Sequence, residues 1–265
     1  MSYTRIAQAA AGGAGAITAA TTAAINTTGA DLIVAAVGSY SPSGTDPTAF
    51  AMSDSKGNSW TAMNLYETSG AILVTMYWSR PTSVGSGHTF TFTAPGANIA
   101  NYPSIAVAAY AGSVASPVDQ QNGNTTGGSG STVQPNSITP SEDSELVLTA
   151  CAWDGSVTMS SINGGFAIEA TANYSAGNAI GVSLAHLIQA TAAAANPTWT
   201  LSGSANDRVA AIASFKSSGG GGAAGQPTRK RWGGVPFMGS GGQQGSTIWR
   251  ERSSGLAVPS WRYAA

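Results

Sequence analysis

The fold class follows from a short apolar stretch near the start of the chain, Asp31-Leu32-Ile33-Val34-Ala35-Ala36-Val37, which lies between Gly29 and Gly38. β-Branched and small apolar side chains, closed at both ends by glycine, are typical of a β-strand that is buried. The leading acid and the apolar run recur at Glu145–Cys151. This pair of stretches is the centre of an internal repeat.

Further strand signals lie on either side of the first stretch. Ala71–Trp78 and Ser104–Tyr110 are apolar runs, and the alternation in His88–Thr93 puts Phe90 and Phe92 on one face of a strand. Clusters of Gly, Pro, Asn and Ser separate these runs, and no segment shows helical periodicity with caps. The sequence therefore predicts an all-β protein.

Five strands recur in the same order, offset by about 105 to 114 residues. The matched segments are Asp31–Val37 with Glu145–Cys151, Ser59–Thr61 with Gly165–Ala167, Ala71–Trp78 with Ala179–His186, Thr89–Phe92 with Thr198–Leu201, and Ile105–Tyr110 with Ala210–Phe215. The favoured interpretation is a single jelly-roll-like β-sandwich built from two internally repeated halves. The alternative is a pair of small tandem sandwiches.

These patterns divide the chain into a body and an arm. Residues 1–217 form the β-sandwich, with repeat halves at about 16–119 and 133–217. Gln120–Thr132 is rich in Gly, Asn, Ser and Thr, which predicts a flexible surface linker between the halves. Residues 218–265 begin with a glycine-rich linker and continue as an extended C-terminal arm.

Charge separates the body from the arm. Only 9% of the 265 residues are charged and the net charge is -1. Residues 1–217 contain five basic and eleven acidic residues, giving -6, while residues 218–265 contain six basic and one acidic residue, giving +5. This composition argues against a strongly basic nucleic-acid binder and against a charge-driven disordered chain.

Membrane and disulfide signals are weak. No apolar stretch approaches the 18 residues of a membrane span, and Met1–Ala20 is a poor signal peptide. The single cysteine, Cys151, lies in an apolar run and is expected to be a buried, inert thiol.

Catalytic and metal motifs are not evident, so no catalytic residue, metal ligand or cofactor is expected. His186 is interpreted as a strand histidine with satisfied polar contacts, and His88 as an exposed loop end. Asp46, Asp54 and Asn58 could hold calcium, but their spacing does not specify a site. Carboxylates that could support glycoside hydrolysis fall into two groups: Glu142, Asp143 and Glu145, which resemble a solvated turn, and the isolated Glu67, Asp154 and Glu169.

The arm gives a clearer indication of function than the catalytic and metal motifs of the body. It contains three of the seven tryptophans among basic residues and glycines, and a glycine-rich segment of this kind cannot bury them in a core of its own. Arginine and tryptophan are typical interface anchors. The candidate partner-binding residues are Arg229, Lys230, Arg231, Trp232, Val235, Phe237, Trp249, Arg250, Arg252, Trp261, Arg262 and Tyr263. The alternatives are a flexible tail, a tail folded onto the acidic body and, less favoured, a nucleic-acid contact.

Several of these motifs resemble a bacterial and bacteriophage β-sandwich family with a D-S-x-G-N-x-W turn and a Y-S-G … D strand end. The resemblance rests on Asp54-Ser-Lys-Gly-Asn-Ser-Trp60, on the strand ending in Tyr77-Trp78, and on Ala109–Ser113 with Pro117-Val118-Asp119. It extends over residues 16–217. The arm's Arg229–Phe237 resembles short C-terminal segments of phage structural proteins.

The resemblance implies a non-enzymatic phage structural protein located in the virion. A capsid decoration or accessory protein, anchored through its arm to other virion proteins, is the favoured function. The alternatives are a tail or fibre component, a receptor module that binds a cell-surface glycan, and an unrecognised enzyme. Aromatic residues that could stack on sugars, Trp60, Tyr66, Tyr77 and Trp78, are more consistent with the core. A homo-oligomer is a further option; no membrane partner is expected.

Overall fold

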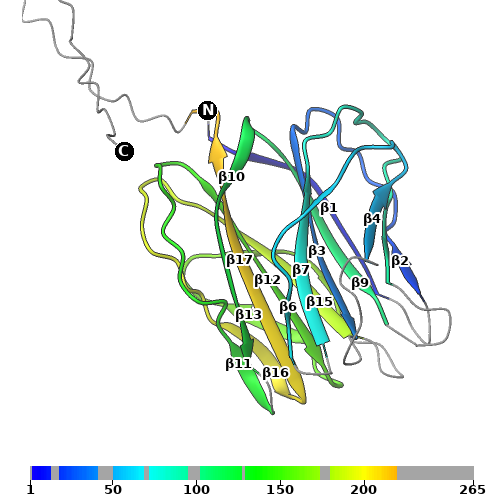
Figure 1. Cartoon of the computed structure of the whole chain (residues 1–265), viewed down its shortest axis with the longest axis vertical. Helices are drawn as coiled ribbons and strands as arrows, with labels where there is room; N and C mark the ends of the chain where they lie inside the picture. Colours follow the sequence, from blue (N-terminus) through cyan, green and yellow to red (C-terminus); the bar gives the residue numbers. More distant parts are fainter. Residues whose placement is uncertain are drawn as a thin grey trace, which may run out of the picture. The chain divides into compact units, whose positions relative to one another are not determined.

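The computed structural model describes residues 2–12, 18–40, 50–68, 72–94, 102–126, 129–173 and 180–219. The chain divides into two units, Met1–Gly225 and Gln226–Ala265, and the described residues all belong to the first. Their regular structure consists of β-strands in antiparallel sheets (Figure 1), which confirms the all-β class. Across these residues there is no helix long and apolar enough to cross a membrane.

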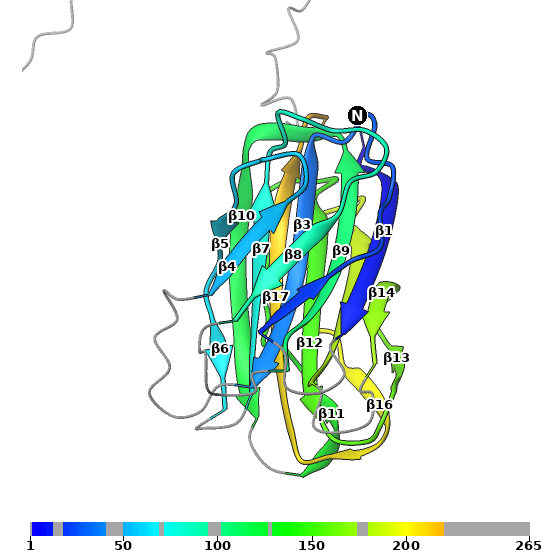
Figure 2. The ribbon, with the colours of Figure 1, turned by 90° about the vertical axis from the view of Figure 1, so that its right-hand side faces the viewer.

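The first half of the body contains two sheets. The larger sheet has the order β1-β9-β3-β7-β5, and β6 also pairs with β7. Its strands are β1 (Thr4–Gly12), β9 (Ser104–Ala111), β3 (Leu32–Tyr40), β7 (Ile72–Ser79), β5 (Thr61–Ala62) and β6 (Tyr66–Glu67). The smaller sheet consists of β2 (Ala19–Thr21), β8 (Phe90–Thr93) and β4 (Ala51–Asp54), and Figure 2 shows it in front of the larger one.

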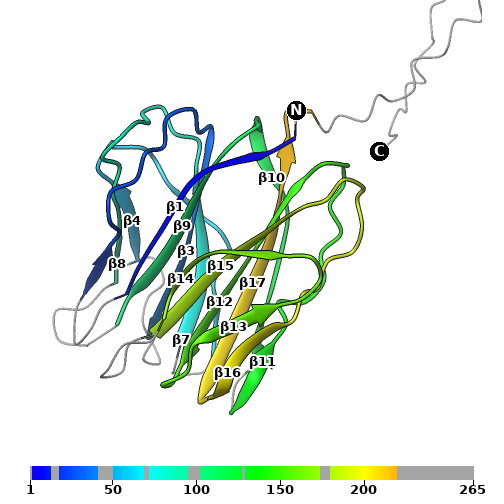
Figure 3. The same cartoon turned by 180° about the vertical axis from the view of Figure 1, so that it is seen from behind.

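The second half has a comparable pair of sheets. Its larger sheet has the order β10-β17-β12-β15-β14 and its smaller sheet the order β11-β16-β13 (Figure 3). The strands are β10 (Ser113–Thr126), β17 (Asp207–Ser217), β12 (Leu146–Asp154), β15 (Ile180–Ile188), β14 (Ala167–Ala172), β11 (Gly130–Val133), β16 (Trp199–Ala205) and β13 (Met159–Ile162). In the larger sheets, β17, β12 and β15 hold the places that β9, β3 and β7 hold in the first half.

The four sheets form four layers with three cores between them. Alternate residues of a strand point to opposite faces. On β3, Leu32 and Val34 pack in the central core between the two larger sheets, whereas Ile33 and Ala35 pack against the smaller sheet. Because the larger sheets are covered on both faces, their central strands are continuous apolar runs instead of alternating patterns.

The layering differs from the single two-layer sandwich that the sequence favours. Each half has its own core between a larger and a smaller sheet: Phe90 and Phe92 fill one core, and Trp153 and Trp199 fill the other. The central core then joins the two larger sheets face to face. Residues 1–225 form one compact unit, and the choice between a single sandwich and two small tandem sandwiches stays a prediction.

Three edge strands, β10, β11 and β1, differ from the sequence-based expectation. The expected flexible linker at Gln120–Thr132 is wrong, because residues 113–126 form β10, which pairs with β17, and residues 130–133 form β11. β1 likewise precedes the expected start of the first half at residue 16 and pairs with β9. Edge strands are held by backbone hydrogen bonds along one side, so their side chains need not be apolar.

Candidate functional site

The arm residues proposed as partner contacts lie outside the described residues. The last described position is Gly219, and all twelve candidates lie between Arg229 and Tyr263. They remain sequence predictions. The body is therefore the part in which a site can be built from geometry.

The aromatic residues considered for sugar stacking are engaged in packing within the body. Tyr77 is buried and packs near Phe92, with ring centroids 6.3 Å apart. Trp60 meets Phe90 edge to face at 6.0 Å, and Trp78 packs against the central core. Their packing agrees with the core interpretation and argues against a free stacking platform.

Asp54, at the end of β4, organises the turn before Trp60. Its buried carboxylate accepts hydrogen bonds from the backbone N–H of Lys56 at 2.8 Å and of Asn58 at 3.3 Å. The indole Nε1 of Trp60 donates to the second oxygen at 2.8 Å. Burial alone would raise the Asp54 pKa, but these donors outweigh it and the pKa is lowered. Since N–H donors occupy both oxygens, the Asp54 carboxylate does not fit a calcium ligand; Asp46, the other carboxylate considered for calcium, lies outside the described residues.

His88 continues this network into the core. Its Nε2 lies 3.2 Å from Asp54 Oδ1 and its Nδ1 lies 2.8 Å from Thr27 Oγ1. Hydroxyl, imidazole and carboxylate in this order resemble a nucleophilic triad. However, Thr27 and His88 are fully buried, and the imidazole stacks on Phe90 at 4.3 Å. Burial lowers the pKa of His88, with a partial opposing effect from Asp54. The network of Thr27, His88, Asp54 and Trp60, called the Asp54 clamp below, has a structural role. The expectation that His88 lies at an exposed loop end is wrong, because its side chain is fully buried.

A second polar cluster joins the two larger sheets at their edge. Glu169 on β14 has a buried carboxylate that pairs with Arg5 Nη1 of β1 at 2.5 Å and also contacts His186 Nδ1 of β15. Burial favours the neutral acid, but His186 and Arg5 outweigh it, so the pKa of Glu169 is lowered. His186 lies on a strand, as expected, and its ring contacts the Glu169 carboxylate.

A third cluster contradicts the solvated-turn interpretation of Glu145. Its side chain is fully buried, and burial raises its pKa, with a further contribution from the nearby Asp119. Asp119 itself accepts hydrogen bonds from the backbone N–H and the hydroxyl of Ser141 at 2.7 and 2.8 Å. Lys216 Nζ lies 3.5 Å from Asp119 and 3.3 Å from Glu142. These charges hold the loop before β12 to the end of β17.

The second group of carboxylates suggested for glycoside hydrolysis does not gather at one site. Glu67 lies exposed on β6 of the first half, whereas Asp154 and Glu169 lie on β12 and β14 of the second half. Among the residues that the structure describes, no group of three or more His, Cys, Asp or Glu side chains could hold a metal ion. Cys151 is fully buried, as predicted, and burial raises its thiol pKa.

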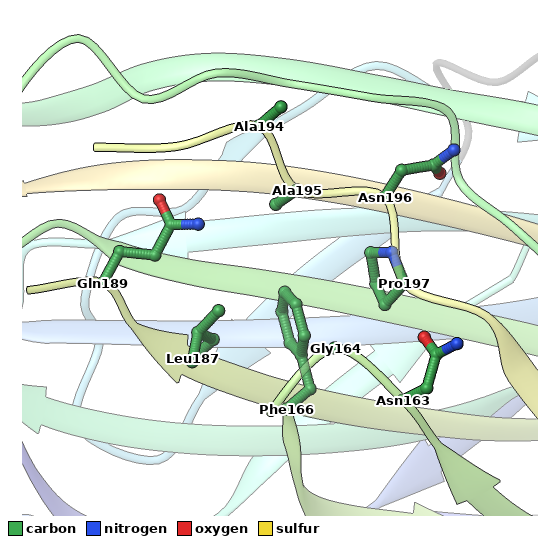
Figure 4. A pocket seen from close by; sticks show the side chains of 9 residues that line it. All are labelled: Asn163, Gly164, Phe166, Leu187, Gln189, Ala194, Ala195, Asn196 and Pro197. Carbon is green, nitrogen blue, oxygen red and sulfur yellow. The ribbon is translucent and has the colours of Figure 1, made fainter. Parts of the chain in front are cut away.

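A pocket of about 320 Å³ opens on the second half (Figure 4). Its walls come from the turn after β13, the end of β15 and the segment that leads to β16; the lining residues are Asn163, Gly164, Phe166, Leu187, Gln189, Ala194, Ala195, Asn196 and Pro197. Phe166 stands between Leu187 and Pro197, with Asn163 and Asn196 on the Pro197 side and Gln189 on the other. No lining residue is charged. The pocket therefore joins an apolar floor to a rim of neutral amides.

The pocket walls are pinned by hydrogen bonds. Gln189 Nε2 donates to the carbonyl of Ala193 at 3.1 Å, which closes the loop on itself. The backbone of Ala195 exchanges two hydrogen bonds with Ile138, at 2.9 and 3.1 Å. On the other wall, Asn163 Oδ1 accepts from the backbone N–H of Thr198 at 2.7 Å. The pocket is therefore largely pre-formed, as ligand sites usually are.

Sequence reasoning did not find this pocket. The tight turn could be recognised from Gly164 and Gly165, whose φ angles of 72° and 80° suit glycine. Nothing in the sequence shows that this turn faces the segment around Asn196 and Pro197, because the two are brought together by the pairing of β13 and β16.

Comparisons with known proteins identify no relative: no family model, curated protein or solved structure matches the chain.

Proposed function

We propose that the chain is a non-enzymatic structural protein of a bacteriophage virion. In this role the β-sandwich body is displayed on the particle and residues 218–265 attach it to another virion protein. A capsid decoration or accessory protein is the favoured assignment, and a tail or fibre component is the alternative.

One observation carries the proposal. Strand β17 ends at Ser217, and the composition changes directly after it. The body before this point has a charge of -6, and the following 48 residues have a charge of +5 with three of the seven tryptophans. Basic residues interleaved with tryptophan are the composition of interface anchors. A separate attachment segment explains why so many large aromatic residues follow a completed sandwich.

The structural contacts of the ionisable residues give additional support. Asp54, Glu169 and Asp119 each hold strands or turns together through buried or half-buried contacts. Such contacts serve the stability of a module that has to persist on a particle surface. They leave these carboxylates with structural partners instead of a substrate.

The test is incorporation into particles. The full chain and a chain that ends at Gly219 are each produced together with the other structural proteins of the virion, and purified particles are analysed by mass spectrometry. We expect the full chain in the particles and the shortened chain only in the soluble fraction, with unchanged circular dichroism. Equal incorporation of the two chains, or absence of the full chain from particles, would refute the proposal.

Point variants of the arm sharpen this test. Trp232→Ala, Trp249→Ala and Trp261→Ala should each leave the body folded, and the best anchor should weaken association by about 2 kcal/mol or more. Raising the salt concentration should weaken association further, because the six basic residues act through screened charges. Immunogold labelling of the particle then separates the capsid location from the tail location.

A further inference from the structure

We infer that the pocket between Asn163 and Asn196 binds a neutral saccharide unit that carries an acetamido group. The inference does not depend on the proposed virion function. Its arguments are the chemistry of the lining, the unpartnered polar groups in that lining, and a comparison with the first half of the same chain.

The lining selects a small, neutral and partly polar ligand. The volume of about 320 Å³ is at the lower end of the range of ligand pockets, roughly 300–1,000 Å³. Phe166, Leu187 and Pro197 offer an apolar floor to the C–H face of a pyranose ring, while no charged side chain compensates an anion or a cation. An entirely apolar ligand would instead bury the amides of the rim without partners, which is costly.

Several polar groups of the lining have no partner within the described part of the chain. Asn163 uses Oδ1 for Thr198, but its Nδ2 has no protein acceptor there, and the side-chain amide of Asn196 has no partner. The backbone N–H groups of Ala194 and Asn196 also donate to no described residue. The two backbone N–H groups, Asn163 Nδ2 and the amide of Asn196 can serve the carbonyl and the hydroxyl groups of a sugar.

The first half shows what such a place can hold. There, the turn after β4 meets the segment between β7 and β8 through the buried side chain of Asn58. Its Oδ1 accepts from the backbone N–H of Thr82 at 2.9 Å and of Ser83 at 3.0 Å, and its Nδ2 donates to the carbonyl of Ser83 at 2.9 Å. A carboxamide is thus the group that joins turn and segment in this half.

In the second half the carboxamide of Asn163 joins turn and segment only at Thr198, whose backbone N–H donates to Asn163 Oδ1. Five residues separate the end of β4 from Trp60, whereas only three separate the end of β13 from Phe166. Within the described residues, this carboxamide makes no hydrogen bond to Gln189–Pro197, and the pocket lies between the shorter turn and that part of the segment. An acetamido group has the carbonyl and N–H of a carboxamide. A ligand that carries this group can therefore make hydrogen bonds in the pocket of the kind that Asn58 makes in the first half.

Titration of the full chain tests the inference. N-Acetylglucosamine and N-acetylgalactosamine are added up to roughly 20 mM, with glucose in a parallel series, and binding is followed by saturation-transfer NMR. We expect at least one of the two acetamido sugars to bind with a Kd of about 1 mM, and glucose to bind about tenfold more weakly or not at all. Absence of binding by both acetamido sugars, or equal binding of glucose, overturns the inference.

Variants locate the binding. Ala194→Trp places an indole at the exposed rim of the pocket and should weaken binding by about tenfold or more. Ala190→Trp is the matched control, because Ala190 is exposed on the same loop but does not line the pocket; it should leave the Kd within about twofold. Equal effects of the two substitutions would place the ligand elsewhere and overturn the inference.

A peptide is the competing class of ligand. N-Acetyl-asparagine amide has the carboxamide without the pyranose ring, and we expect it to bind at least about tenfold more weakly than the better of the two acetamido sugars. Equal or tighter binding of this compound would show that the pocket accepts a peptide side chain, and the saccharide assignment would then be wrong.

Discussion

Replacing Gly181 by alanine should destabilise the second half through a collision with Trp153. The two residues are paired on β15 and β12, and the indole of Trp153 lies across the glycine. A Cβ atom built on Gly181 would approach the indole Cδ2 to 2.8 Å and overlap Cε2 and Cζ2 still more. The indole cannot move away freely, because it is fully buried and its Nε1 donates to the carbonyl of Val157 at 2.9 Å.

The magnitude follows from these contacts. Overpacking of a core costs about 1–3 kcal/mol, and losing the indole hydrogen bond costs about 1 kcal/mol more. We therefore expect Gly181→Ala to lower the free energy of unfolding by about 2–4 kcal/mol. For a body of this size each kcal/mol shifts the Tm by about 2–4 °C. Urea and thermal unfolding of the full chain, followed by circular dichroism, measure both quantities.

A control and a compensating variant make the reasoning refutable. Gly12→Ala adds the same methyl group to a strand, where its nearest neighbour would be the Cβ of Ala172 at an ordinary 3.5 Å. It should be neutral or stabilising by up to about 1 kcal/mol. Trp153→Phe should relieve part of the cost of Gly181→Ala, so the double variant should be more stable than the sum predicts. If Gly181→Ala unfolds with the wild-type midpoint, the packing argument is wrong.

Three further predictions concern the polar clusters and the thiol. Glu169→Gln should cost about 1–3 kcal/mol, less than a fully buried pair, because Arg5 is 46% exposed and partly screened by solvent. The lowered pKa of Glu169 means that its stabilisation is present above the ordinary value of 4.5 and is lost as the pH falls through the folded-state pKa. Denaturation from about pH 5 to about pH 2 should therefore show a shallower loss of stability in the variant; an unchanged slope would exclude the ion pair as a cause. Asp54→Ala should cost about 2–4 kcal/mol and shift the emission of Trp60, because it leaves the Trp60 and Lys56 N–H groups without their acceptor; wild-type stability would contradict the Asp54 clamp. Cys151 should react with a thiol reagent only as fast as the protein unfolds, since it is fully buried; rapid labelling of the native protein would show that this core opens.

The apolar runs predict the central strands because almost every residue in them is apolar and becomes buried. Leu32–Val37 and Leu146–Trp153 are covered on both faces, so nearly every position is apolar and the strands can be recognised without knowledge of their neighbours. The burial of Cys151 follows from the same pattern. Phe90 and Phe92 alternate with threonine because the smaller sheet is covered on one face only.

The edge strands could not be predicted from composition. β10 contains Gln120–Thr126, a polar stretch that has the composition of a linker, and it is ordered by pairing with β17. The sequence predicts that Glu145 belongs to a solvated turn, but the neighbouring strands and the loop before β12 cover its side chain. In both cases the local sequence is polar and the environment comes from segments far away along the chain.

By itself, the sequence determined the all-β class, the central strands and the change of composition at residue 218, since these depend on side chains that are neighbours in the chain. Only the tertiary structure decided the four layers, the Asp54 clamp and the pocket between Asn163 and Asn196. The physical reason is that stacking of sheets and the approach of two loops depend on strand pairing across long separations, which no local pattern encodes.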